Sequence, residues 1–428
     1  MLVSTQKSRQ NRAALFRRLR FQLPVLWGVS VGIPALLVFS GILTVDTYRA
    51  AINSAIASGL AGLFGLLAVR RVDSFPGVRS YAFILPALAA AFGLALVLTF
   101  GLRLAYSRSI FLGSFSLSVL LVPVLVYVSE RTNRLCFYTV PGGDADALHD
   151  IRGAEWIRMD EPTMPPFPAM LVADFRHDHD DVWERLLATA AISGRVVYHS
   201  KLLRESLTGR VTIQHLSENS FGSLVPNLAY RKIKRVVDIA ACIVLVPVLI
   251  LPMLAIAAAI RMDSKGPVLF KQERMGFRGQ VFQMVKFRTM RDRLVEDSDA
   301  AARHDAMTRT DDARITRPGR FLRRTRLDEL PQILNILRGE MSWIGPRPEA
   351  VPLSQWYEQE IPFYSYRHII RPGISGWAQV HQGHVTDLDA INEKLAYDFY
   401  YVKYFSAWLD MVIAFRTIPT MIGGFGAK

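Results

Sequence analysis

Two neighbouring acids, Asp328 and Glu329, directly follow a stretch that is crowded with arginine. The arginines of this stretch are Arg314, Arg317, Arg320, Arg323, Arg324 and Arg326. A guanidinium matches phosphate oxygens bidentately, a carboxylate can attack phosphorus, and Mg²⁺ is held by one or two carboxylates together with substrate phosphates. A helix predicted at residues 333–337 would direct its N-terminus at the same place. The pattern therefore indicates a site for phosphates and a divalent metal.

A structural explanation of these residues stays open at this point. A carboxylate beside arginines can belong to a salt-bridge network, and Asp328 follows Thr325 at a spacing close to a capping box. Pro331 suits a first helical turn, whose amides lack intrahelical partners. The flanking segments predict strands at residues 267–272 and 281–290, a loop at 291–313, and a turn-rich loop at 339–348 that holds Arg347 between prolines.

The rest of the chain is unusually apolar. Hydrophobic residues make up 51% and charged residues 21%, which excludes a disordered chain. Residues 23–45, 52–69, 81–100 and 109–128 are each long enough for a membrane helix. Residues 1–22 are basic and carry no acid, and the run that follows them is too long for a signal-peptide core. We therefore expect four retained spans.

The formal charge of +14 favours anionic partners. Its basic residues are concentrated before the first span, between the second and third, and after the fourth. The positive-inside rule then places both ends of this helical bundle in the cytoplasm. Because so much of the basic charge follows membrane topology, a nucleic-acid partner is not expected.

A fifth apolar run covers residues 239–260 and is basic on both flanks. It contains Pro247 and Pro252, and each proline removes an amide donor and kinks or breaks a helix. A hairpin that enters and leaves the same leaflet explains both features. An ordinary kinked transmembrane helix is the alternative, and it would place everything after residue 261 outside the cell.

The middle of the chain predicts a small α/β module at residues 135–222, with strands near 135–140, 169–173 and 194–199 and a helix near 181–191. A dinucleotide site would need a Gly-x-Gly-x-x-Gly motif after the first strand. Only Gly142 and Gly143 are present, and Asp144 and Asp146 follow them. The sequence therefore favours a degenerate Rossmann-like module without a cofactor.

The C-terminal half carries several motifs in order. They are Lys234-Arg235-x-x-Asp238, the proline-broken run, residues 286–290, the acid pair within 327–332, residues 345–348, and residues 371–380 (Arg-Pro-Gly-Ile-Ser-Gly-Trp-Ala-Gln-Val). With these motifs the chain resembles the bacterial sugar transferase family, the monotopic phosphoglycosyl transferases that act on polyprenyl phosphate. The four spans and the α/β insert are similar to the long branch that primes exopolysaccharide or O-antigen synthesis.

The resemblance implies a membrane protein of four parts. These are a basic cytoplasmic N-terminus (1–22), a four-helix transmembrane bundle (23–128), a degenerate Rossmann-like α/β module (135–222), and a C-terminal α/β catalytic domain (230–428) with a proline-broken re-entrant helix (236–260). It also implies a bacterial inner-membrane location with the catalytic domain facing the cytoplasm.

The roles that the resemblance implies centre on the acid pair. Asp328 would be the nucleophile and the Mg²⁺ ligand, and Glu329 its dyad partner. Phosphate or substrate binding would fall to Arg323, Lys286, Arg288, Arg347 and Arg371. The implied substrates are a nucleoside diphosphate sugar, such as a UDP-hexose, and undecaprenyl phosphate. Arg326 departs from the family pattern, since many members carry a small hydroxyl residue there.

Two other functions remain open from the sequence. A membrane-anchored nucleotide-sugar dehydratase or oxidoreductase would suit the domain plan but requires the missing glycine motif. A non-enzymatic scaffold for polysaccharide assembly would tolerate substitution of the acid pair. The sequence identifies neither the sugar nor the oligomeric state, and a homodimer is compatible with it.

Overall fold

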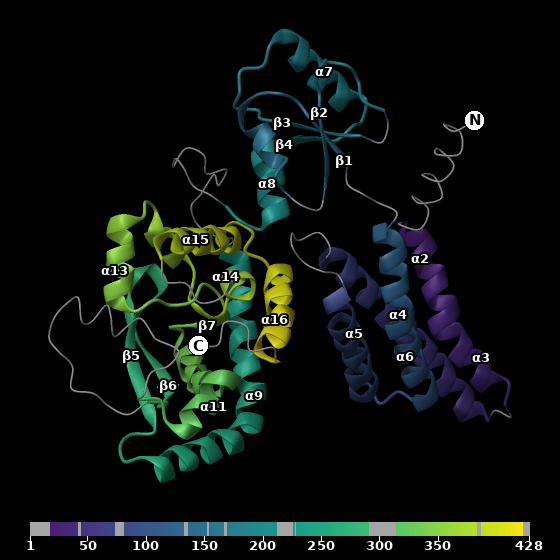
Figure 1. Ribbon diagram of the computed structural model, residues 1–428. Helices are drawn as coiled ribbons and strands as arrows, with labels where there is room; N and C mark the ends of the chain where they lie inside the picture. Colours follow the sequence, from purple (N-terminus) through teal and green to yellow (C-terminus); the bar gives the residue numbers. More distant parts are fainter. Residues whose placement is uncertain are drawn as a thin grey trace. The chain divides into compact units, whose positions relative to one another are not determined.

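The computed structural model describes residues 18–41, 44–72, 81–131, 136–151, 154–166, 169–211, 226, 228–290, 314–382 and 387–422. The chain divides into two compact units, Met1–Gly209 and Arg210–Lys428. Figure 1 follows the elements of both units along the sequence. The predicted loop at residues 291–313 lies outside the described residues.

Apolar helices open the first unit. They are α2 (Leu19–Leu26), the π-helical turns η1 (Trp27–Gly32), α3 (Ile33–Phe39), α4 (Val45–Val72), α5 (Tyr81–Gly101) and α6 (Arg108–Arg131). The first two predicted runs have different limits in the structure. The first helix ends at Phe39 and Gly41 follows in a bend, whereas Val45 starts the second helix, just after Thr44, whose hydroxyl accepts from the amide of Thr47.

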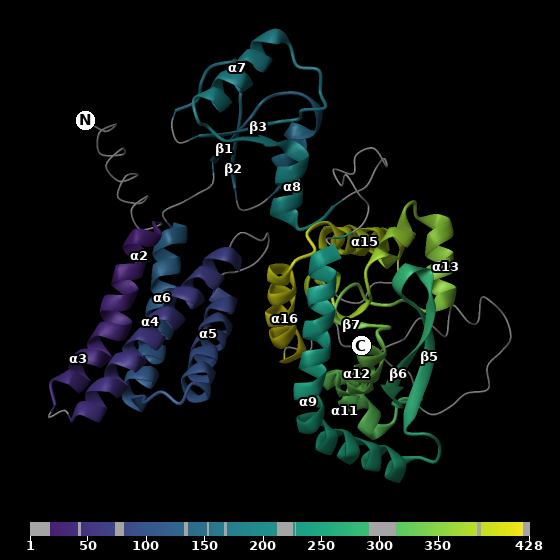
Figure 2. The same cartoon turned by 180° about the vertical axis from the view of Figure 1, so that it is seen from behind.

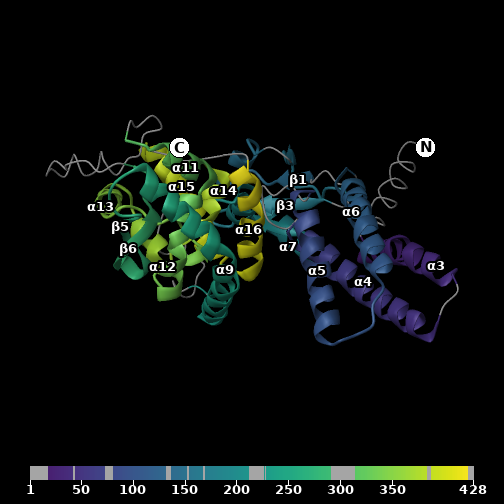
Figure 3. The same ribbon diagram turned by 90° about the horizontal axis from the view of Figure 1, so that it is seen from below.

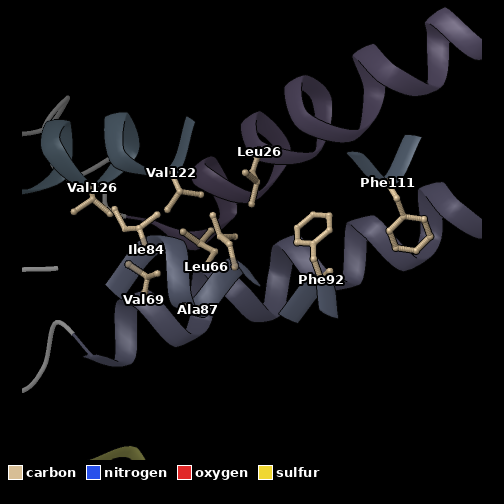
Figure 4. Packing of buried hydrophobic residues seen from close by; sticks show 11 residues of the cluster. Leu26, Leu66, Val69, Ile84, Ala87, Phe92, Phe111, Val122 and Val126 are labelled. Carbon is tan, nitrogen blue, oxygen red and sulfur yellow. The ribbon is translucent and has the colours of Figure 1, made fainter. Parts of the chain in front are cut away.

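The helices of this unit pack on one another through apolar side chains. Figure 3 shows α4, α5 and α6 side by side. Between them Leu26, Leu66 and Val122 point toward a common interior and are almost fully buried (Figure 4). Among the described residues of the whole chain, five helices are long and apolar enough to cross a membrane: Leu19–Phe39, Val45–Arg71, Ile84–Gly101, Arg108–Val128 and Leu228–Asp263.

The α/β module has the predicted character. Its parallel sheet has the order β2-β1-β3-β4, formed by β1 (Cys136–Thr139), β2 (Glu155–Arg158), β3 (Met170–Ala173) and β4 (Val197–His199). The helices are η2 (Gly143–Leu148), α7 (Asp181–Ile192) and α8 (Ser200–Thr208). The predicted helix and the strands at 169–173 and 194–199 are confirmed, whereas β2 was missed because no alternating pattern marks it.

The turn after β1 is filled by the module's own side chains. The Asp174 carboxylate accepts a hydrogen bond of 2.9 Å from the amide of Asp144. Gly142 and Gly143 both have positive φ, and a Cβ added to them would meet His177 and Asp174 respectively. In a parallel α/β sheet a ligand phosphate binds to the amides of this turn. Here Asp174 takes the place of such an anion.

The second unit starts with the long helix α9 (Leu228–Asp263), which remains helical through Pro247 and Pro252. Figure 1 and the view from behind in Figure 2 show that α9 turns sharply toward its lower end. The antiparallel pair β5 (Leu269–Met275) and β6 (Val281–Phe287) follows, joined by the turn η4 (Phe277–Gly279). Both strands were predicted, with their limits shifted by a few residues.

The second unit continues with shorter helices, 3₁₀ turns and two further strands. They are α11 (Arg317–Thr325), η5 (Leu327–Gln332), α12 (Ile333–Arg338), β7 (Ser342–Ile344), α13 (Val351–Glu360), η6 (Tyr364–Ile369), β8 (Gly373–Ser375), α14 (Trp377–His381), α15 (Leu388–Lys403) and α16 (Ala407–Ile422). Strands β7 and β8 pair in parallel. The helix predicted at 333–337 is confirmed as α12.

Helix α16 packs on other elements of the second unit, namely α14, β7 and β8. Leu409, Val412 and Ile413 are fully buried. The Asp410 carboxylate is bound on both oxygens, by the ammonium of Lys234 and by the hydroxyl of Tyr401, each at 2.5 Å.

Candidate active site

A break between two helices presents the acid pair. Helix α11 begins at Thr316, whose hydroxyl accepts from the amide of Gly319 at 3.0 Å, and it ends at Arg326 in the left-handed conformation (φ 57°). The 3₁₀ turn η5 follows at once and carries Asp328 and Glu329. Thr325 donates its hydroxyl back to the carbonyl of Phe321 at 2.8 Å, so its side chain does not form the capping box considered from the sequence.

Glu329 gathers three cations around one carboxylate. Its Oε1 lies 2.9 Å from the guanidinium of Arg347, 3.4 Å from the ammonium of Lys286 and 3.8 Å from the guanidinium of Arg326. Burial raises the pKa of Glu329, but the positive charges of Arg347, Lys286 and Arg326 outweigh burial and hold it far below the ordinary value. Glu329 is therefore a fixed negative charge in the centre of this cluster.

Asp328 lies in a different electrostatic setting. Its pKa is raised, first by burial and then by the neighbouring charge of Glu329, while Lys286 and Arg347 oppose the rise. Within the described part of the chain, its carboxylate has no hydrogen bond or ion pair. A half-buried and uncommitted carboxylate beside a cation cluster can act as a nucleophile toward phosphorus or as a metal ligand.

Lys286 comes from the end of strand β6. Burial lowers the pKa of its ammonium to about 8, against the opposing effect of Glu329. The strand is fixed by Asn335 of α12, which accepts from the Val285 amide at 3.0 Å and donates to the Gln283 carbonyl at 2.8 Å. This tie places Lys286 next to η5.

The loop that carries Arg347 is held in place by hydrogen bonds between two glycine-containing motifs, residues 345–348 and 371–380. The amide of Gly345 donates to the carbonyl of Ser375, and the amide of Gly373 donates to that of Pro346. A Cβ added to Gly345 or Gly373 would collide with the opposite backbone. These two positions require glycine because the chains run so close together.

Two predicted binding residues lie elsewhere and have other partners. Arg288 is buried and donates to the carbonyls of Ser264 and Lys265, each at 3.0 Å, in the turn after α9. Arg371 donates to the Gly339 carbonyl at 2.8 Å and stands over the ring of Phe277. Neither guanidinium joins the Glu329 cluster. Arg323 does lie close enough for its charge to lower the pKa of Asp328.

Sequence reasoning missed two arginines that support the site. Arg274 of β5 donates to the Pro348 carbonyl at 3.1 Å, and Arg367 of η6 donates to the Arg347 carbonyl at 2.9 Å. Both act on a loop that is far away in sequence, so no local spacing could have revealed them.

The residues present fit Mg²⁺ only with help from a substrate. The described residues contain no group of three or more His, Cys, Asp and Glu side chains that could hold a metal. Mg²⁺ commonly takes one or two carboxylates and completes its shell with phosphate oxygens and water. Asp328 provides one uncommitted carboxylate of that kind.

Comparison with known proteins identifies the class. Residues 229–424 match the family model of the bacterial sugar transferases. The UDP-N-acetylgalactosamine-undecaprenyl-phosphate N-acetylgalactosaminephosphotransferase of Aeromonas hydrophila is 40% identical over 380 residues, 88% of each chain. This chain therefore belongs to the bacterial sugar transferase family.

Other relatives match less than half of this chain. The UDP-glucose:undecaprenyl-phosphate glucose-1-phosphate transferase of Xanthomonas campestris pv. campestris is 45% identical over 173 residues, which is 40% of this chain and 35% of that protein. The protein of the same name from Escherichia coli K12 is 40% identical over 191 residues, 44% of this chain and 40% of that protein.

Proposed function

We propose that this protein transfers a sugar 1-phosphate from a UDP-sugar to undecaprenyl phosphate. The observation that carries the proposal is the division of labour in the acid pair: Glu329 is saturated with cations, whereas Asp328 is uncommitted. The printed activities of the relatives supply the substrate class. A nucleotide-sugar dehydratase or oxidoreductase would need a Gly-x-Gly-x-x-Gly motif, which does not follow strand β1.

The proposed transfer takes two displacements at one phosphorus. A carboxylate oxygen of Asp328 attacks the β-phosphorus of the donor, the bond to the oxygen that bridges the two phosphates breaks, and UMP leaves. The enzyme then carries an acyl-phosphate sugar. An oxygen of the lipid phosphate attacks the same phosphorus, the bond to Asp328 breaks, and the free carboxylate returns with a lipid diphosphate sugar as the product.

The cation cluster would stabilise the charge that develops on the transferred phosphate. Catalysis of phosphoryl transfer rests on positioning and on neutralising oxygen charge. Lys286 and Arg347 are held by Glu329 at fixed positions, and Arg323 adds positive charge near Asp328. Mg²⁺ bound at Asp328 would neutralise donor phosphate oxygens and promote departure of UMP.

The donor sugar is open, and UDP-N-acetylgalactosamine is the first to test. The Aeromonas hydrophila relative, whose name specifies that sugar, aligns with 88% of this chain. The glucose-specific relatives align with less than half of it.

We further propose that α9 is a re-entrant membrane helix. Both of its halves pack on the same domain: Cys242 lies in a cluster with Ile336 of α12, and Ile260 in a cluster with Leu322 of α11. Side chains on its other flank are exposed, among them Val244 at 70%, Val248 at 68% and Leu251 at 73%. Such an apolar flank suits lipid. After the helix, strand β5 pairs with β6 within the same domain (Figure 1).

This seating would place the acid pair at the level of lipid phosphates on the cytoplasmic face of the bacterial inner membrane. A reporter tag at the C-terminus tests the topology. Modification by a membrane-impermeant reagent only after the cells are opened supports the re-entrant form. Labelling of intact spheroplasts would mean that α9 crosses the membrane.

The chemistry is tested with membranes that contain the variant Asp328→Asn and a donor labelled in its β-phosphate. The variant should fold normally and form no covalent phosphosugar adduct, whereas wild-type protein accumulates the adduct when lipid phosphate is withheld. Normal labelling of Asp328→Asn would rule out Asp328 as the nucleophile. Chelation of divalent metal should suppress adduct formation by wild-type protein, and added Mg²⁺ should restore it.

A further inference from the structure

A second basic pocket lies in the C-terminal unit and contains neither acid of the active site. It has a volume of about 550 Å³, and its lining includes Arg231, Arg278, Ser365 and Tyr366. These residues come from the start of α9, from the β5–β6 turn and from η6. The pocket is therefore assembled from three segments that are distant in sequence.

Two of the lining arginines, Arg231 and Arg278, share one aromatic ring with Arg371, which lies outside the lining. The Cζ atoms of Arg231, Arg278 and Arg371 stand 5.8, 5.0 and 5.2 Å from the centre of the Phe277 ring. Like charges this close repel one another. Burial lowers the pKa of Arg371, and Arg235, Arg231 and Arg278 lower it further.

The carboxylate of Asp238 acts on this cluster through its charge, which raises the pKa of Arg371 and opposes the arginines. Within the described residues, Arg231, Arg278 and Arg371 form no ion pair. Glu358 also lines the pocket, but its carboxylate lies 3.6 Å from His368, and burial raises its pKa. Burial, followed by the charge of Arg367, lowers the pKa of His368 to about 3, so this imidazole adds no positive charge near neutral pH. Glu358 adds a carboxylate to the lining, whereas the positive charge of the pocket comes from the arginines, which have no ion-pair partner among the described residues.

The backbone at the β5–β6 turn of the pocket has a conformation of high free energy for a non-glycine residue. Arg278 has φ 55° and ψ 33°, a left-handed conformation that glycine or asparagine adopts more cheaply. Gly279 directly after it has positive φ too. A long cationic side chain at such a position is an outlier of the kind that concentrates at ligand sites.

We propose that this pocket is a second phosphate-binding site, distinct from the one at Asp328. Guanidinium groups bind phosphate oxygens bidentately, and Ser365 and Tyr366 add hydroxyl donors to the lining. Two sources share this chemistry: the phosphate of an anionic lipid head and a soluble phosphate. Arg231 lies in the first turn of α9, just before the exposed Ile233, Val236 and Val237, so a headgroup could reach it. None of these residues takes part in the proposed transfer reaction, so this site is independent of it.

The test uses the full chain in nanodiscs of neutral phosphatidylcholine. The thermal unfolding midpoint is followed during titration with inorganic phosphate at constant ionic strength, and separately as phosphatidylglycerol replaces part of the neutral lipid. A ligand that binds the folded state raises the midpoint. The test variant is Arg278→Gln at the exposed turn, and Arg338→Gln, an exposed arginine of α12, is the matched control.

The variant Arg278→Gln loses a charged hydrogen-bond donor. Its affinity for whichever probe stabilises the wild type, inorganic phosphate or phosphatidylglycerol, should therefore be about tenfold to a hundredfold weaker. Arg338→Gln should match wild type. A response to inorganic phosphate that depends on Arg278 assigns the pocket to soluble phosphates, and one confined to phosphatidylglycerol assigns it to lipid heads. If Arg278→Gln responds to both probes as wild type does, the proposal is overturned. Phosphate bound at the active site contributes equally to all three proteins and cancels in the comparison.

Discussion

Arg367 fixes the backbone of Arg347, because its Nη2 donates to the Arg347 carbonyl at 2.9 Å. The side chain of Arg347 in turn donates to Glu329. Arg367 is itself buried, with its guanidinium 2.7 Å from Asp398 and donating to the Tyr364 hydroxyl at 2.6 Å. The position of the Arg347 guanidinium beside Glu329 thus depends on a buried network around Arg367.

Arg367→Gln should therefore lower kcat by about 10²-fold, because a displaced Arg347 no longer meets the developing charge. Tyr364→Phe removes a neighbouring hydroxyl but keeps the bond to Arg347, so its kcat should stay close to wild type. Steady-state rates of UMP release give both values, and unfolding midpoints identify loss of fold. Equal rates for Arg367→Gln and Tyr364→Phe would show that Arg367 does not position Arg347 for catalysis.

Activity should fall as the pH rises through about 8, because the Lys286 ammonium loses its proton there. Lys286→Arg keeps the positive charge at high pH, since a guanidinium titrates far higher. In this variant the alkaline limb of the kcat/KM profile should move to higher pH, whatever rate remains. A limb that stays near 8 would show that another group causes it.

Glu329→Gln should move the same limb in the opposite direction. The negative charge of Glu329 raises the pKa of Lys286, so its removal lets burial lower that pKa further. The maximal rate should also fall by about 10²–10³-fold, by analogy with the loss of one charge-stabilising partner. An unchanged alkaline limb would contradict the assigned coupling between the two side chains.

Asn335→Ala should destabilise the C-terminal unit by about 1–3 kcal/mol for each buried backbone group left unpaired. The fully buried Asn335 bonds to the Val285 amide and to the Gln283 carbonyl. Arg338→Ala, in the exposed last turn of the same helix, should stay within about 0.5 kcal/mol of wild type. Unfolding midpoints in one detergent compare the two, and equal midpoints would show that the tie is dispensable.

Local pattern predicted the elements of the site better than the partners of its side chains. The acid pair, the strands around Lys286 and the helix after Pro331 are local features with recognisable periodicity or turn residues. The partners of Arg288 and Arg371 could not be predicted from the sequence, because a guanidinium that can bind phosphate can also donate to backbone carbonyls, as both do here. Arg288 closes the turn at Gly266, where an added Cβ would meet its guanidinium.

The double duty of α9 bears on how this enzyme can be handled. Its inner flank supplies Cys242 and Ile260 to two hydrophobic clusters of the C-terminal unit, while the apolar side chains of its outer flank are exposed. Removing the chain up to Asp263 would remove the α9 side chains from both hydrophobic clusters. A fragment that keeps α9 also keeps its exposed apolar side chains. We therefore expect that no fragment of the catalytic unit is both active and water-soluble, and that active preparations need detergent or lipid.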